Sequence, residues 1–244
     1  MGKNEFEGIK RQVCTKIDYL YEALCASIPS IKAESLLQSK ISINSSPFVY
    51  QNERINCSIE DIILTIPSSE IRHLYRSDEK NIDNVELRLS LNGCINANTW
   101  KDKDKNPWET LTLKTKLIVL TMTGMYTRNF HVDLIEDNEN IYQEVHPLSH
   151  IHFHGTSDNC EKNVEIDVPR LVHFPLDMVL GLSVALRNYL PAAYEKLKNN
   201  PIYLGLCYES QKRLLVPYFN VYRNGIGVDG KANKTIQKVC PYLV

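Results

Sequence analysis

Apolar residues recur at steps of three and four between residues 5 and 28, the spacing that places them on one side of an α-helix. These residues are Phe6, Ile9, Val13, Ile17, Leu20, Leu24 and Ile28. Pro29 ends the pattern. We therefore predict a helix over Glu5–Ile28 that packs on a sheet or, as the alternative, docks on a partner. A second helical piece is predicted over Ile31–Ser39.

The middle of the chain has the twofold alternation and the β-branched residues that are typical of strands. Strands are predicted in short pieces of Ile41–Ser69 and at Val85–Leu91, Leu111–Met122, Tyr126–Ile135, Ile141–Val145, Ser149–His154 and Val164–Val168. The segment Asn92–Glu109 carries charges of both signs, which is typical of a solvated loop. Its Trp100 and Trp108 are candidate partner-binding residues, and packing on the sheet edge is the alternative.

A further helix is predicted over Phe174–Leu190, with Asp177 near its positive end, and it continues to about Asn199. The tail is predicted to form the strands Ile202–Tyr208 and Leu214–Tyr222. A helix, consecutive strands and then a helix favour an α+β fold. We expect an antiparallel β-meander flanked by an N-terminal helix and a helix at 174–199, in one domain spanning 1–244, with 1–70 as a candidate subregion.

Composition narrows the classes of function. A net charge of −1 with no basic run argues against broad duplex binding, although it permits a local phosphate site. The seven cysteines are scattered and never spaced as Cys-x-x-Cys, which argues against a disulfide framework and a zinc knuckle. With no apolar leader and no apolar run of about 18 residues, we expect a cytoplasmic protein without a membrane partner.

Three histidines at alternate positions, His150, His152 and His154, are the strongest chemical signal. A strand places such residues on one face, and imidazole suits both metal ligation and proton transfer. His131 and Asp133 alternate in an earlier predicted strand and join the same patch if the two strands are neighbours. The alternative is a polar strand without chemistry.

In such a patch the three histidines are candidate catalytic residues and candidate ligands of a divalent metal ion, zinc or manganese. Asp133 is a further catalytic candidate, as a ligand or as an acceptor for an imidazole N–H. An open metal position activates water for hydrolysis. Arg170 and His173 precede the predicted helix and form a candidate anion-binding site; alternatively Arg170 pairs with a nearby carboxylate.

The histidine string also resembles the His-φ-His-φ-His-φ-φ signature of histidine-triad nucleotide hydrolases, where φ is apolar. That resemblance implies an attacking role for His152, but Gly155 and Thr156 stand where the last two apolar residues belong. The metallo-β-lactamase pattern His-x-His-x-Asp-His fails because His154 stands in place of the Asp.

Residues 123–200 contain His146-Pro-Leu-Ser-His-Ile-His, followed by a strand and the proline-flanked approach to the helix. This stretch resembles a diffuse group of uncharacterised bacterial proteins with a His-Pro-x-x-His-x-His segment, some of them in toxin–antitoxin or anti-phage defence loci. The resemblance implies a bacterial protein that acts on or alongside nucleic acid or nucleotides, and it brings no agreed activity.

Two functions remain open from the sequence. The first is a non-catalytic accessory subunit of a defence or toxin–antitoxin system, which docks a protein partner through its first helix or its tryptophan-bearing segment. The alternative is a histidine-centred hydrolase of phosphodiester or nucleotide substrates. Balanced charge and the lack of nucleophile motifs favour the subunit, and the histidine strand favours the hydrolase.

Overall fold

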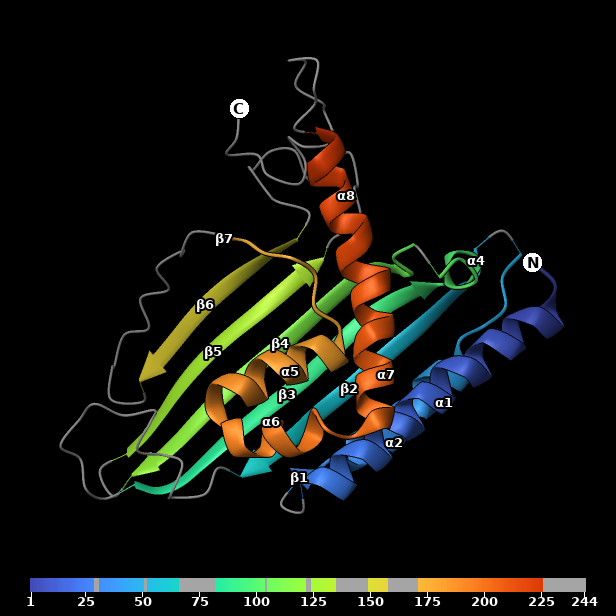
Figure 1. Cartoon of the computed structure of the whole chain (residues 1–244). Helices are drawn as coiled ribbons and strands as arrows, with labels where there is room; N and C mark the ends of the chain where they lie inside the picture. Colours follow the sequence, from blue (N-terminus) through green and yellow to red (C-terminus); the bar gives the residue numbers. More distant parts are fainter. Residues whose placement is uncertain are drawn as a thin grey trace.

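A seven-stranded sheet in the order of the sequence organises the molecule (Figure 1), and each strand pairs with the next in antiparallel fashion. The computed structural model describes residues 1–28, 31–50, 52–65, 82–103, 105–121, 124–134, 149–157 and 171–225. The strands are β1 (Ile31–Lys32), β2 (Arg54–Thr65), β3 (Ile82–Asn96), β4 (Trp108–Thr121), β5 (Gly124–Leu134), β6 (Ser149–Ser157) and β7 (Leu171–Val172).

Helices precede and follow the meander. They are α1 (Lys3–Ser27), α2 (Glu34–Ser45), α4 (Ala97–Trp100), α5 (Met178–Tyr189), α6 (Pro191–Leu197), α7 (Pro201–Ser210), the π-helix η2 (Gln211–Leu215) and α8 (Val216–Gly225). Figure 1 shows α5, α6 and α7 on one face of the sheet and α1 with α2 along its β2 side. The predicted α+β meander with flanking helices is therefore confirmed.

The two faces of the sheet differ in polarity because side chains alternate along each strand. In β3 the residues Val85, Leu87, Leu89 and Leu91 are at most 1% exposed. They face the helix layer, whereas the residues between them are polar. Helix α1 contributes the apolar side that its sequence predicted, with Phe6 and Leu24 fully buried.

Helix α2 protects the free edge of β2. The hydroxyl of Ser46 accepts a hydrogen bond from the backbone N–H of Asn56 at 2.9 Å, and Ser42 accepts one from Ser58 at 3.4 Å. Strand β1 pairs only with Ile63 and Leu64 of β2, so on this side the amides of Asn56 and Ser58 face no strand among the described elements. Covering an edge in this way blocks pairing with another chain.

Several predicted bounds in the first half of the chain are wrong. Ile31 and Lys32 form a strand, and α2 continues to Ser45, through residues that were expected to be strand-like. The segment Asn92–Glu109 is not one long loop, because β3 and β4 pair as far as Ile95 opposite Trp108. Asn96 then starts α4 by accepting hydrogen bonds from two backbone amides, at 2.9 and 3.1 Å.

The predicted strands of the tail are also wrong, because both segments are helical. Asn200 caps α7 by accepting from the amides of Ile202 and Tyr203, and Pro201 fits its first turn. The buried positions Tyr203, Leu206, Ser210 and Leu214 then follow a spacing of three and four. Tertiary packing of this stripe overrides the β-propensity of the isoleucine, valine and tyrosine residues.

The helix predicted at 174–199 is present as α5 and α6, but it begins at Met178 rather than Phe174. The Asp177 side chain accepts a hydrogen bond from the Leu180 amide at 3.0 Å and so fixes the start of α5. The predicted strands Ile141–Val145 and Val164–Val168 lie outside the described residues.

Candidate functional site

The polar face of the sheet brings the predicted histidine positions together. Strand β5 pairs with β6 so that His131 lies opposite His152, Asp133 opposite His150, and Asn129 opposite His154. The expectation that the two strands are neighbours in register is confirmed. The side chains of His150, His152 and His154 lie outside the described ones, so their catalytic and metal-binding roles stay predictions.

The register extends these pairs into rows that cross four strands. In one row Ser90 and Lys114 continue the line of His131 and the His152 position. In the next row, Arg88 and Lys116 continue the line of Asn129 and the His154 position. Sequence reasoning missed Arg88, Lys114 and Lys116, although a meander with a continuous register places polar positions of all its strands on one face.

A hollow of about 360 Å³ lies over these rows, and its volume is within the range of small-molecule sites, about 300–1,000 Å³. Its charged lining residues include Arg88, Lys114, Lys116 and Asp61, and His131 also lines it. Three permanent cations thus face one carboxylate. The hollow is therefore electropositive on a chain whose net charge is −1.

The cations of the hollow differ in how they are held. Arg88 donates to Glu86 at 2.9 Å and lies 3.5 Å from Asp61, so its charge is already balanced within the protein. Lys114 and Lys116 are exposed and make no ion pair among the described residues. These two lysines are consequently the cations that a bound anion would meet.

His131 and Asp133 contact each other next to the hollow. Nε2 of His131 lies 3.0 Å from Oδ2 of Asp133, and their side chains are 24% and 15% exposed. A carboxylate in this place orients an imidazole ring.

The predicted anion site before α5 is only half described, because Arg170 lies outside the described residues. Nδ1 of His173 is 2.6 Å from the carbonyl oxygen of Phe174. Burial lowers the pKa of His173, and this hydrogen bond only partly opposes the effect. The neutral ring is favoured at neutral pH, which weakens the case for His173 as an anion ligand.

Trp100 and Trp108 pack inward, on the helix-covered side of the sheet. Trp100 is 7% exposed and donates its indole N–H to Gln12 at 3.0 Å. The Trp108 ring covers Gly93 so closely that a Cβ there would lie 2.8 Å from it. This packing favours the alternative to partner binding, in which both rings pack on the sheet.

Among side chains that the structure describes, no group of three or more histidine, cysteine, aspartate or glutamate residues is placed to hold a metal ion. None of the described helices combines the length and the apolar character needed to cross a lipid bilayer. The chain matches no known protein-family model, no curated protein and no solved structure.

Proposed function

We propose that the polar face of the sheet binds a small phosphate-bearing molecule of the nucleotide class. The observation that carries this proposal is the hollow in which Lys114 and Lys116 stand beside His131. The chain then acts as a binding module, in line with the accessory role expected from its sequence.

Phosphate suits the hollow because exposed ammonium groups are point charges that match phosphate oxygens. The rows also continue to the positions of His152 and His154.

Binding is tested by titrating ATP, AMP, inorganic phosphate and adenosine into the protein in an isothermal calorimeter. We expect ATP to bind and adenosine not to bind, and Lys114→Ala/Lys116→Ala to weaken ATP binding roughly tenfold. That figure follows from two exposed ion pairs at about 0.2–1 kcal/mol each. Added salt should weaken the binding as well.

The matched control is Lys3→Ala/Lys196→Ala, which removes the same charge from exposed positions on α1 and α6. This variant should bind ATP like the wild type. Equal losses in the two double variants, or equal binding of adenosine and ATP, would contradict a specific phosphate site.

A second candidate function is hydrolysis of the bound phosphodiester or nucleotide, and the contact between His131 and Asp133 favours it. The same samples, with zinc, manganese or a chelator, can be analysed for released product. A hydrolase should lose product formation in His152→Ala while keeping ATP binding. If ATP binds but no product forms with zinc, manganese or the chelator, the result would support a non-catalytic binding module.

The predicted role as a subunit with a protein partner also stays a proposal. The described feature that favours it is a set of exposed apolar side chains on α7 and α8, which are Leu204, Tyr208, Val216 and Phe219. A stoichiometric complex isolated from the native cell, and lost in Tyr208→Asp/Phe219→Asp, would support it. If the complex persists in that variant, the partner does not bind through these side chains of α7 and α8.

A further inference from the structure

A second cavity lies on the opposite, helix-covered face of the sheet. It is bounded by α1, the strands β2 and β3, the start of α5, and the helices α7 and η2. Its volume is about 100 Å³, smaller than the engineered cavity of about 150 Å³ that binds benzene. Such a cavity suits a molecule of only a few carbon atoms.

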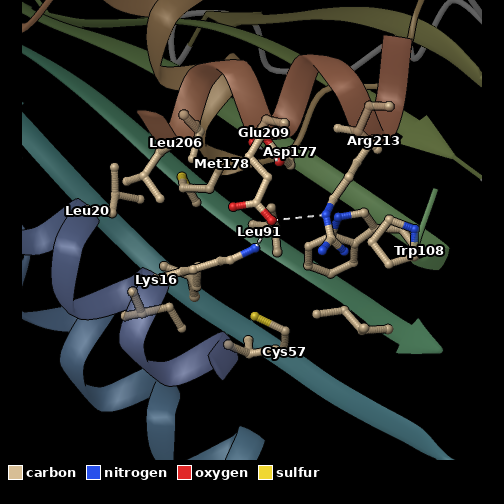
Figure 2. Close-up of a pocket in the computed structure, with 18 of the residues that line it drawn as sticks. Lys16, Leu20, Cys57, Leu91, Trp108, Asp177, Met178, Leu206, Glu209 and Arg213 are labelled. Carbon is tan, nitrogen blue, oxygen red and sulfur yellow. Dashed lines mark hydrogen bonds and ion pairs between the residues drawn. The ribbon is translucent and has the colours of Figure 1, made fainter. Parts of the chain in front are cut away.

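Charged side chains gather at one side of this otherwise apolar cavity (Figure 2). Lys16 reaches from α1 and Arg213 from η2, and both form ion pairs with Glu209 between them. Burial alone would raise the pKa of Glu209, but the hydrogen bond from Lys16 and the two positive charges lower it overall. Glu209 is therefore an anion already engaged by two cations.

Within this cluster, Arg213 is left with an unused hydrogen-bond donor. Its side chain is 7% exposed, and its Nη1 is buried without a hydrogen-bond acceptor among the described residues. Its Nε lies 3.1 Å from Oε1 of Glu209, and its Cζ lies 4.3 Å from the centre of the Trp100 ring. A buried guanidinium with an unused donor costs stability unless an acceptor reaches it.

Among the described residues, none of the other polar groups of the lining, Asp177, Ser210 and Cys57, accepts a hydrogen bond from Nη1 of Arg213. The two oxygens of Asp177 are engaged by the Leu180 amide at 3.0 Å and by the Ser210 hydroxyl at 2.7 Å. Burial raises the pKa of the Cys57 thiol to about 12, so it stays neutral. The cluster thus holds Lys16 and Arg213 beside the carboxyl groups of Glu209 and Asp177, with an unused donor on Arg213.

We propose that this cavity binds a small monocarboxylate whose apolar body lies among the apolar walls and whose carboxylate meets Arg213. The guanidinium matches a carboxylate in geometry and charge. Apolar side chains of α1, β3 and α7, including Val13, Leu91 and Leu206, surround the space for the body of the ligand. This site is independent of the phosphate site, because the two lie on opposite faces of the sheet.

The two tryptophans of the chain give a direct measurement, since both line this cavity. We expect sodium butyrate to cause a saturable change in tryptophan fluorescence, whereas butyramide, sodium phosphate and sodium chloride at equal concentration should not. Butyramide has nearly the same shape without the charge. Arg213→Gln should weaken butyrate binding at least about tenfold, because a charge-assisted hydrogen bond is lost.

Arg187→Gln is the matched control, because it removes an exposed arginine of α5 and should leave butyrate binding unchanged. A folded Arg213→Gln that binds butyrate like the wild type would overturn the proposal, and so would a wild type that responds equally to butyramide. If Arg213→Gln does not fold, Cys57→Leu decides the question. It keeps Arg213 but fills the cavity, so unchanged butyrate binding in Cys57→Leu would also overturn the proposal.

Discussion

Replacing Trp100 with alanine is expected to lower the free energy of unfolding by about 3–5 kcal/mol. The side chain is 7% exposed, and its removal enlarges a cavity that the surrounding elements cannot close. Lys16 and Arg213, whose charged groups lie 4.2 and 4.3 Å from the ring centre, lose their aromatic contact. The indole N–H bond to Gln12 is lost as well.

Urea denaturation followed by far-ultraviolet circular dichroism measures this loss without relying on tryptophan emission. Trp108→Ala is the comparison, and it should cost less because that side chain is only partly buried. A Trp100→Ala variant as stable as the wild type would mean that Trp100 is an exposed anchor, as one of the two interpretations of the sequence held.

Gly181→Ala is expected to destabilise the protein by about 2 kcal/mol, although alanine normally favours a helix. A Cβ at this position of α5 would lie 2.1 Å from Cδ2 of Leu113, which is fully buried in β4. The added methyl group must displace the Leu113 side chain, which has little room to move because it is fully buried. Overpacking of this kind costs more than the helix propensity returns.

Gly205→Ala on α7 should have the opposite effect, a gain of about 0.5–1 kcal/mol, because nothing lies within 4 Å of an added Cβ there. The double variant Gly181→Ala/Leu113→Ala should lose less stability than the sum of its two single variants, since Leu113→Ala removes the clash. Denaturation curves of the wild type, the two single variants and the double variant test this. Additive losses of stability would mean that the strain does not arise from the contact between Gly181 and Leu113.

Local sequence patterns predicted only part of the polar patch. Alternation in the segments around His131 and His152 indicated two half-buried strands, and their short separation suggested that they are neighbours. Lys114 and Arg88 belong to the same patch, but they come from strands 17 to 43 residues before His131. Only the pairing of the whole meander aligns them, so the electropositive hollow was not visible in the sequence.

The tail shows where local patterns mislead. Residues 202–208 and 214–222 are rich in isoleucine, leucine, valine and tyrosine, and this composition favours strands. A capping asparagine and a proline at residues 200 and 201 start a helix instead, and burial against α5 and α1 stabilises it. The sequence contained this cap signal, but the signal spans only two residues. Whether the segment becomes a helix is determined by the elements on which it packs.

By itself, the sequence determined the elements whose periodicity is long and consistent: the N-terminal helix, the central strands and the helix after residue 174. It also determined the alternation that separates the polar face from the apolar face. The tertiary structure alone decided which distant side chains meet, including Lys16, Glu209 and Arg213, which come from α1, α7 and η2. The physical reason is that periodicity reports the direction of a side chain within its own element, whereas a site depends on contacts between elements far apart in the chain.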